Sequence, residues 1–323
     1  MFKICLIGCG NHSTFVYGRA LKKYQEERVS SVELAGCCDL DMPRAKKYQE
    51  TFGFNNAYDD FNKMIDNVKP EALIAILPEN LAAGLGVEIM GYKIPLLVEK
   101  PPGINTHENI TLKQCAKQLD IPHLVNFNRR YTPMLKEVKK IFSGNTPDHI
   151  YYGMYRHKRL EKHFYTTAIH AIDAVRFLSG SDYKKVAFTY HEIPGTEAAN
   201  IYIDGEMATG TKINIVICPN SGMVVECGTI AANNLFLNFN LPFNDKPTPA
   251  HKITLARDTI PEDVLIGHGD GYHISGGFYN CIAMFLDDIA DKKYGLYKTA
   301  FDEALQSSRV AECIANREPM ISF

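Results

Sequence analysis

Short apolar segments that alternate with helical stretches dominate the first 130 residues of this chain. Five of these segments are almost entirely apolar and lack the polar alternation of a half-exposed strand. Strands of this composition, separated by helices, are typical of a parallel sheet that helices cover on both faces. We therefore predict an α/β domain with a Rossmann-type, doubly wound parallel sheet, whose strands lie within residues 2–8, 32–39, 72–77, 95–100 and 123–129.

The pattern changes after a further predicted helix that ends at Gly144. Segments with alternating apolar and polar residues now follow one another, with Gly, Pro and Asn turns between them, which indicates an α+β domain with an open, mostly antiparallel sheet. One helix, residues 165–180, interrupts these strands and ends at Gly180, and two amphipathic helices close the chain. The predicted strands lie within residues 149–159, 184–193, 199–205, 210–219 and 222–230.

These two patterns predict two domains. We expect an α/β domain at residues 1–124 and an α+β domain at residues 125–323, with the last helices packing against either one. A ligand cleft is then expected beside the carboxyl ends of the parallel strands.

Charge and cysteine content argue against several classes of protein. The chain has 35 Lys and Arg against 37 Asp and Glu, so electrostatics offers no reason to expect nucleic acid or a membrane surface as partner. No apolar stretch reaches about 18 residues, and we expect no signal peptide at the amino terminus. The nine cysteines include no C-x-x-C pair, so we expect free thiols, a cytoplasmic location and no metal site.

The segment GCGNHS, Gly8 to Ser13, directly follows the first predicted strand. It is similar to the phosphate-binding turn G-x-G-x-x-G, but its third glycine is replaced by Ser13. Gly8 permits the tight turn, and Gly10 lets the backbone approach a pyrophosphate at the start of the next helix. The first candidates for cofactor binding are therefore Gly8, Gly10, Asn11, His12 and Ser13.

Asp39 ends the second predicted strand and is placed to accept hydrogen bonds from an adenosine ribose. Asp41 adds a second carboxylate that would repel a 2′-phosphate, so we expect NAD rather than NADP as the cofactor. A turn or helix-capping aspartate is the alternative interpretation of Asp39.

Two further groups point to acid/base chemistry. Lys100, within Glu99-Lys100-Pro101 at the end of the fifth predicted strand, is placed to hydrogen-bond a substrate hydroxyl and pass on its proton. His170 and Asp173 are three residues apart on one face of the predicted helix 165–180, which fits a general acid/base beside a carboxylate. The alternatives are a surface lysine and a buried or capping histidine.

The ordered motifs G-x-G, E-K-P, NFNRRYTP (126–133) and H-x-x-D-x-x-R-x-L-x-G (170–180) together resemble the Gfo/Idh/MocA family of sugar and polyol dehydrogenases, over essentially the whole chain. The resemblance implies that residues 1–124 form a dinucleotide-binding Rossmann domain. It also implies that residues 125–323 form a substrate-binding and oligomerisation domain with an open sheet, through which dimers or tetramers assemble. It implies that Lys100 bridges nicotinamide and substrate, that His170 is the catalytic histidine, and that Asp173 is its structural companion. It also implies cofactor-side positions for Leu77, Pro78, Asn80, Glu99 and Asn128, and a substrate-side position for Arg129.

Two residues depart from the family pattern. Because the third glycine serves helix–strand packing, we expect Ser13 to weaken packing at most, and its hydroxyl to cap the helix or reach a phosphate. Thr166 stands four residues before His170, where many sugar-oxidising relatives have an acidic residue. Tyr165, Thr166 and Thr167 are therefore candidate substrate-binding residues that substitute for this acid, unless the substrate is handled differently.

We expect an NAD(H)-dependent oxidoreductase that moves hydride between nicotinamide and a hydroxyl or carbonyl carbon of a sugar, polyol or sugar-derived substrate, with Lys100 and His170 as the acid/base pair. The alternatives are a non-catalytic NAD- or sugar-binding sensor or scaffold, and an NADP-linked reductase of a cyclic or imine-type substrate. The expected partner is a small carbohydrate-like molecule, with neither nucleic acid nor membrane, and the expected assembly is a homodimer or homotetramer. The basic segment 154–164 fits a solvated loop or a site for an anionic substrate, and the glycine-rich segment 267–277 fits a cleft-side loop or a simple connection.

Overall fold

The computed structural model describes residues 1–28, 30–243, 252–267, 271–298 and 300–323. The chain divides into two compact units, which we describe separately. Unit 1 comprises Met1–Asn126 and Phe278–Leu305, and unit 2 comprises Phe127–Gly277 and Gln306–Phe323. Part of the glycine-rich segment 267–277 lies outside the described residues.

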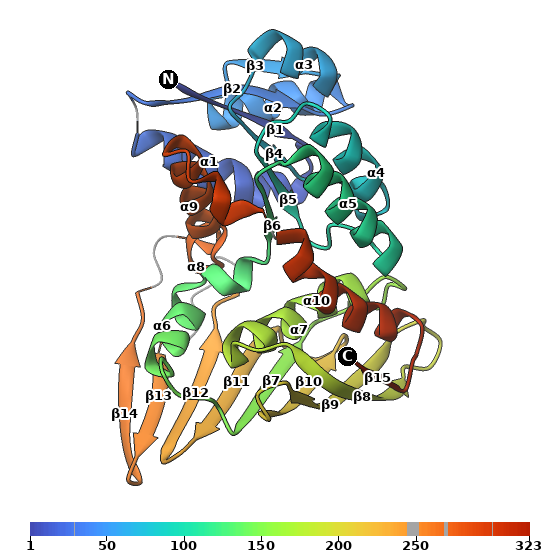
Figure 1. Cartoon of the computed structure of the whole chain (residues 1–323), viewed down its shortest axis with the longest axis vertical. Coiled ribbons are helices and arrows are strands. Elements are labelled where there is room, and N and C mark those ends of the chain that lie inside the picture. Colours follow the sequence, from blue (N-terminus) through green and yellow to red (C-terminus); the bar gives the residue numbers. More distant parts are fainter. Residues whose placement is uncertain (29, 244–251, 268–270, 299) are drawn as a thin grey trace. The chain divides into compact units, whose positions relative to one another are not determined.

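Unit 1 contains a six-stranded sheet of parallel strands in the order β3-β2-β1-β4-β5-β6 (Figure 1). This is the strand order of doubly wound dinucleotide-binding domains, so the predicted fold class is confirmed. Each predicted segment contains one strand, and only the three-residue edge strand β3 was missed, because it is too short to show a pattern. The strands are β1 (Phe2–Ile7), β2 (Val32–Cys38), β3 (Asn56–Tyr58), β4 (Ala72–Ala75), β5 (Leu96–Glu99) and β6 (His123–Asn126).

Helices cover both faces of this sheet, with α1 and α9 on one side and α4 and α5 on the other (Figure 1). Side chains that accept backbone N–H groups begin several of them. Asp41 caps α2, Asp60 caps α3, and Asn105 caps α5. The helical segments are η1 (Ser13–Tyr17), α1 (Gly18–Glu26), α2 (Met42–Phe52), α3 (Phe61–Val68), α4 (Glu79–Met90), α5 (Thr106–Leu119), α9 (Phe278–Ala290) and η3 (Tyr294–Tyr297).

The parallel register brings the carboxyl ends of the strands to one edge of the sheet. Ile7 of β1 is paired with Cys38 of β2 and with Ala75 of β4. In the same way Glu99 of β5 is paired with Asn126 of β6. The residues that follow these positions in the chain therefore emerge at the edge where open α/β sheets bind their ligands.

Unit 2 contains a nine-stranded sheet in the order β14-β13-β12-β11-β7-β10-β9-β8-β15. Among the described strands of this sheet only β7 and β10 pair in parallel, so the predicted mostly antiparallel sheet is confirmed. Five of its strands match predicted segments, and β12 to β15 were missed. The strands are β7 (His149–Tyr155), β8 (Tyr183–Glu192), β9 (Ala199–Met207), β10 (Lys212–Cys218), β11 (Val225–Ala232), β12 (Leu235–Leu241), β13 (Lys252–Arg257), β14 (Ile260–Leu265) and β15 (Met320–Ser322).

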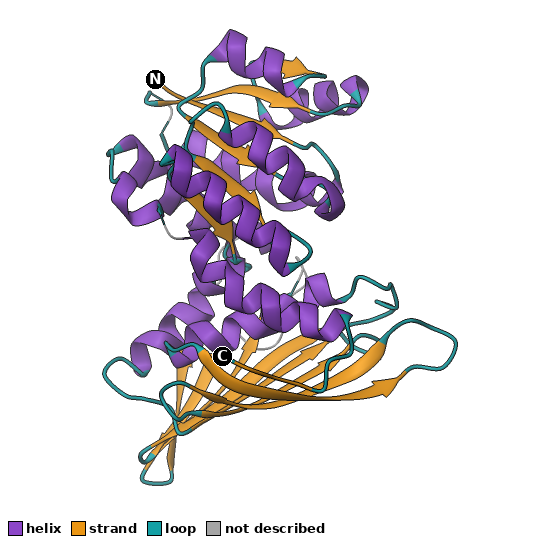
Figure 2. Cartoon of the chain, turned by 45° about the vertical axis from the view of Figure 1, so that its right-hand side comes forward, coloured by secondary structure: helices purple, strands orange, loops and turns teal. Residues whose placement is uncertain are grey.

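One face of the unit 2 sheet packs against α6 and α7, and the other face has no helix in the described part of the chain (Figure 2). The end of α7 at the left-handed Gly180, with φ 66°, agrees with the prediction. None of the described helices is long and apolar enough to span a bilayer. The helical segments are η2 (Asn128–Tyr131), α6 (Pro133–Ile141), α7 (Tyr165–Ser179) and α8 (Tyr272–Ser275), and α10 (Ala300–Ala315) passes from unit 1 into unit 2.

Candidate active site

A cavity of about 700 Å³ lies in unit 1 at the carboxyl edge of the parallel sheet. This volume is in the range of small-molecule sites. The turn after β1, the loop after β2 and the segment from the end of β4 into α4 line it. Asn80, in the second position of α4, is exposed and lies outside the cavity lining. The lining includes the predicted residues Gly8, Gly10, Asn11, His12, Ser13, Asp39, Leu77 and Pro78.

The two glycines of the turn serve different structural purposes. Gly8 has φ 98°, and a Cβ at this position would lie 2.0 Å from the carbonyl oxygen of Ile76, so a side chain is excluded. A Cβ at Gly10 would meet no atom within 4 Å, so the backbone there faces open space in the cavity. A bare backbone beside the first helical N–H groups fits the pyrophosphate of a dinucleotide.

Ser13 contributes to packing inside unit 1. Its side chain is fully buried, and its Oγ lies 2.9 Å from the hydroxyl of Tyr48 on α2. Gly18 completes the same contact between helices, because a Cβ there would lie 2.4 Å from the ring of Phe52. The Ser13 hydroxyl is thus bonded to a neighbouring helix, contrary to our expectation that it caps a helix or reaches a phosphate. Sequence reasoning did not identify Gly18.

Asp39 organises the loop after β2. Its carboxylate accepts hydrogen bonds from the backbone N–H groups of Cys9, at 2.9 Å, and Asp41, at 3.0 Å, and from Arg44 at 3.2 Å. Asp39 therefore ties this loop to the glycine turn, as the alternative interpretation of a turn aspartate requires, while it also lines the cavity. Four carboxylates line this end of the cavity, whereas Arg44 is the only Lys or Arg among the described lining residues.

Glu99 and Lys100 form the corner at the end of β5. The Glu99 carboxylate is largely buried, and it accepts hydrogen bonds from the backbone N–H of Lys100, at 2.9 Å, and from the hydroxyl of Tyr17, at 2.5 Å. Burial alone would raise the pKa of Glu99. The pKa is nevertheless lowered below its ordinary value by His12, Lys100 and Tyr17. The Nε2 atom of His12 lies 3.3 Å from the Glu99 carboxylate. Glu99 is therefore a buried carboxylate at neutral pH. The Lys100–Pro101 peptide bond is cis.

A small hollow of about 30 Å³ lies at this corner, lined in part by Glu99, Lys100 and Leu77. Leu77 also lines the large cavity. The Lys100 corner and the cavity of the glycine turn are thus neighbouring parts of one edge of unit 1.

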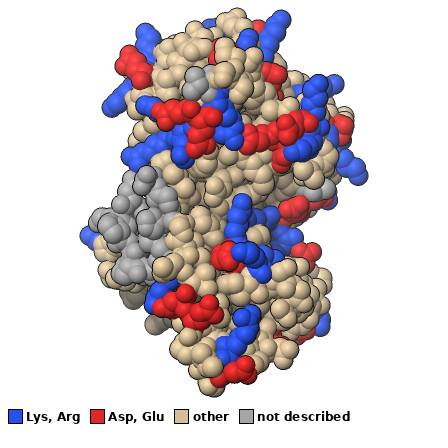
Figure 3. All heavy atoms as spheres, turned by 90° about the vertical axis from the view of Figure 1, so that its left-hand side faces the viewer, with Lys and Arg blue, Asp and Glu red and all other residues tan. Residues whose placement is uncertain are grey.

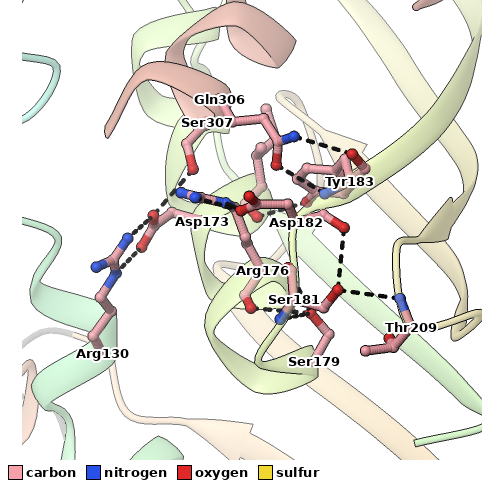
Figure 4. A network of polar contacts seen from close by, with 11 residues as sticks. Arg130, Asp173, Arg176, Ser179, Ser181, Asp182, Tyr183, Thr209, Gln306 and Ser307 are labelled. Carbon is pink, nitrogen blue, oxygen red and sulfur yellow. Dashed lines mark hydrogen bonds and ion pairs between the residues drawn. The ribbon is translucent and has the colours of Figure 1, made fainter. Parts of the chain in front are cut away.

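Asp173 lies in unit 2, on α7, and is almost fully buried. Its carboxylate accepts two hydrogen bonds from Arg130, at 2.7 and 2.8 Å, and one from Ser307 at 3.1 Å (Figure 4). These partners come from η2 and α10, so Asp173 holds α7 against two other segments of unit 2. His170 is one turn earlier on the same helix and is 8% exposed. Sequence reasoning named neither Arg130 nor Ser307 as a partner.

Asn128 and Arg129 are buried in unit 2, and their polar atoms are engaged there. The Asn128 amide donates to the carbonyl of Gly276 at 2.7 Å and accepts from Arg129 at 3.1 Å. Arg129 donates to both oxygens of Glu226, at 2.5 and 3.2 Å. These contacts give both residues a structural function, and any contact with cofactor or substrate stays a prediction.

Glu226 is the centre of this buried cluster, and it also accepts hydrogen bonds from Arg156 and from the hydroxyl of Tyr152. Burial alone would raise the pKa of Glu226, but the two arginines hold it well below its usual range. Arg156 belongs to the basic segment 154–164, so one of the positively charged residues of that segment has a structural function. Glu226 was missed, although a glutamate at an inward-facing position of an alternating strand was a usable signal.

The three candidates at the start of α7 are half-buried or buried. The Thr166 hydroxyl donates to the carbonyl of His163 at 2.8 Å, and the Thr167 hydroxyl accepts from Arg159 at 2.9 Å. Tyr165 lines a separate cavity of about 220 Å³ in unit 2. Whether these side chains bind a substrate stays a prediction.

On the face drawn in Figure 3, Lys and Arg residues are interspersed with Asp and Glu residues, and the residues described there form no continuous basic surface. Among the residues that the structure describes, no group of three or more His, Cys, Asp or Glu side chains is arranged to hold a metal ion.

Known proteins resemble this chain in the sequence of its first part and in its fold. Residues 2–127 match the GFO_IDH_MocA model, described as an oxidoreductase family with an NAD-binding Rossmann fold. A Gfo/Idh/MocA family oxidoreductase from Vibrio cholerae has the same fold, with a TM-score of 0.83 and 20% identity over 98% of both chains. An oxidoreductase from Agrobacterium radiobacter, solved with NAD⁺, L-tartaric acid and magnesium, aligns with a TM-score of 0.81 and 14% identity over 99% of this chain and 98% of that one.

A curated relative is the glucose-6-phosphate 3-dehydrogenase of Bacillus subtilis, 26% identical over 145 residues. That alignment covers 45% of this chain and 39% of the relative, so the chain spans about two fifths of the relative's length. The structure defines a Rossmann-type α/β unit and an open-sheet α+β unit. The chain is similar to Gfo/Idh/MocA oxidoreductases in sequence over residues 2–127, and it shares the fold of a solved oxidoreductase of that family over 98% of its length.

Proposed function

We propose that this protein is an NAD(H)-dependent dehydrogenase that transfers hydride between nicotinamide and a hydroxyl or carbonyl carbon of a sugar, polyol or sugar-derived substrate. The observation that carries the proposal is the Glu99–Lys100 corner, which adjoins the cavity of the glycine turn through Leu77. A lysine beside a dinucleotide site is placed for proton transfer to or from a substrate oxygen. The oxidoreductase family model that matches residues 2–127 and the name of the curated relative support this reaction class.

The cavity in unit 1 fits the cofactor. Gly8 and Gly10 leave the backbone open for the pyrophosphate, with Asn11 and His12 at the start of the helix, and Asp39 is placed beside the ribose. Bound nicotinamide supplies the hydride chemistry. Four carboxylates against one guanidinium oppose a 2′-phosphate, so we infer NAD rather than NADP.

Lys100 and His170 are the proposed acid/base pair. Lys100 holds the reacting substrate oxygen and His170 accepts or returns its proton, as in general acid/base catalysis. Asp173 acts indirectly in this proposal, since its bonds to Arg130 and Ser307 hold the helix that bears His170. Unit 1 then binds the cofactor, and unit 2 binds the substrate.

The open face of the unit 2 sheet is the proposed assembly surface. Its outward positions include Tyr151, Tyr155 and Val216, which are partly buried although no described helix covers them. Half-buried aromatic and aliphatic side chains on an open sheet suit contact with a second copy of the chain. We infer a homodimer or homotetramer assembled through this sheet.

A titration with NADH and NADPH, followed by nicotinamide fluorescence, tests the proposal together with turnover on a panel of sugars, polyols and sugar acids. We expect tighter binding of NADH and NAD⁺-dependent oxidation of at least one panel member. Thr166, which stands at the position of an acid, favours the second candidate, a non-catalytic sensor. NADH binding without turnover on the panel would support that sensor, and a preference for NADPH would refute our assignment of the carboxylates.

A further inference from the structure

The hydroxyl of Tyr17 lies between two side chains at the carboxyl edge of the unit 1 sheet. Tyr17 is the last residue of η1 and is fully buried. Its hydroxyl donates to Glu99 Oε1 at 2.5 Å, and Asn126 Nδ2 donates to the Tyr17 oxygen at 2.5 Å. The β5–β6 register, which pairs Glu99 with Asn126, accounts for their presence on either side of one phenol.

These hydrogen bonds have only one possible direction. An amide nitrogen only donates, and a carboxylate only accepts. The phenol must therefore accept from Asn126 and donate to Glu99. Burial, and then the charge of Glu99, raise the pKa of Tyr17 well above its usual value, so the phenol keeps the proton that it donates. Such charge-assisted hydrogen bonds are stronger than neutral ones.

The backbone and neighbouring rings fix the phenol at this point. η1 is a π-helical turn directly after the glycine turn, and such turns are frequent at functional sites. The Tyr17 ring makes edge contacts with His12, at 5.9 Å between centroids, and with Phe278, at 5.8 Å. A ring held in this way keeps its place when only the hydroxyl is removed.

The second oxygen of Glu99 accepts the backbone N–H of Lys100. We propose that Tyr17 is a positioning residue for Lys100: the donor chain Asn126→Tyr17→Glu99 holds Glu99 as an oriented carboxylate, which in turn fixes the backbone and the charge environment of Lys100. This inference rests on the proposed function, because it gives Tyr17 its effect through the proposed catalytic lysine.

Tyr17→Phe tests the inference, and Tyr24→Phe is its matched control. Tyr24 is also a buried tyrosine of unit 1, and its hydroxyl also donates to a carboxylate, that of Asp287, at 2.8 Å. Both variants lose one buried hydroxyl bonded to a carboxylate, so a purely structural effect is common to both. Only Tyr17→Phe removes the donor to Glu99.

The primary measurement is kcat/KM against pH with a substrate that turns over. Because Tyr17 helps to lower the pKa of Glu99, its loss raises that pKa, and the acidic limb of the Tyr17→Phe profile moves to higher pH. The Tyr24→Phe limb stays at the wild-type pH. An unchanged limb in Tyr17→Phe, or an equal shift in both variants, overturns the inference.

A second measurement needs no substrate. Glu99 has a lowered pKa in the folded protein, so its contribution to stability is present above its ordinary pKa and is lost as the pH falls through the folded value. The stability lost by Tyr17→Phe is therefore largest near pH 7 and shrinks in acid, and a loss that stays constant with pH overturns the inference. Lys100→Met separates the two proposals: normal turnover in that variant refutes the proposed function, whereas the stability measurement still decides whether Tyr17 acts on Glu99.

Discussion

Restoring the third glycine of the nucleotide-binding turn should damage the fold and leave the cofactor site intact. Ser13→Gly removes the 2.9 Å bond between the Ser13 hydroxyl and that of Tyr48, both of which are buried. Losing this bond costs about 1–2 kcal/mol, and a glycine inside a helical segment costs about 1 kcal/mol more. We therefore expect the free energy of unfolding to fall by about 2–3 kcal/mol.

Urea unfolding followed by circular dichroism measures this loss, and nicotinamide fluorescence measures the affinity for NADH. Ser13→Ala separates the two contributions, because it removes the hydroxyl without the backbone cost of glycine. A double-mutant cycle with Tyr48→Phe isolates the bond itself, with an expected coupling of about 1 kcal/mol. NADH affinity should stay within about threefold of wild type in every variant.

Two results would refute this reasoning. Unchanged stability in Ser13→Gly would show that the bond to Tyr48 contributes nothing. A tenfold change of NADH affinity in Ser13→Ala at constant stability would show that the hydroxyl serves the phosphate, as we first expected from the sequence.

Two further substitutions test the site and its support. Gly8→Ala places a Cβ 2.0 Å from the carbonyl oxygen of Ile76 at a φ of 98°, so it should cost at least about 2 kcal/mol and weaken NADH binding at least tenfold; normal NADH affinity would exclude the proposed turn. Glu226→Gln leaves Arg129 and Arg156 buried with no carboxylate, so at pH 7 it should cost about 3 kcal/mol in urea unfolding. Because the Glu226 pKa is lowered by folding, this difference should narrow as the pH falls below the ordinary carboxyl range, and a difference that widens in acid would contradict the assigned charge.

Much of unit 1 could be predicted from the sequence because its determinants are local. Apolar segments without alternation marked five of the six strands, and Gly8 and Gly10 marked the turn. The close approach of Gly8 to Ile76 shows why only glycine fits there. Asp39 lines the cavity, and its contact with a cofactor ribose stays a prediction. Its bonds to the backbone of Cys9 and Asp41 had no signal in its own segment.

The missed residues depend on contacts between distant parts of the chain. Tyr17 and Asn126 are 109 residues apart, and Tyr17 is the last residue of a π-helical turn. Glu226 is separated from Arg129 by 97 residues. No periodicity or spacing predicts such pairs, because strand register and helix packing bring them together.

The missed strands of unit 2 have a different cause. β12 alternates buried and exposed residues over Leu235–Leu241, but its exposed positions are occupied by Phe236 and by asparagines, which are typical of turns. β15 has only three residues, and it pairs with β8, which lies much earlier in the chain. Pairing partners therefore define these strands more than their own composition does.

The proposed function of Lys100 is tested most directly by comparing hydride transfer and cofactor binding in Lys100→Met. Lys22→Met is the control, because Lys22 is exposed. A single turnover with a substrate from the panel, followed by nicotinamide absorbance, gives the rate of hydride transfer, and fluorescence titration gives the NADH affinity of the same variant. We expect Lys100→Met to bind NADH within about threefold of wild type and to transfer hydride at least about 100-fold more slowly. Hydride transfer at the wild-type rate in Lys100→Met would contradict the central claim that Lys100 is the acid/base residue of this site.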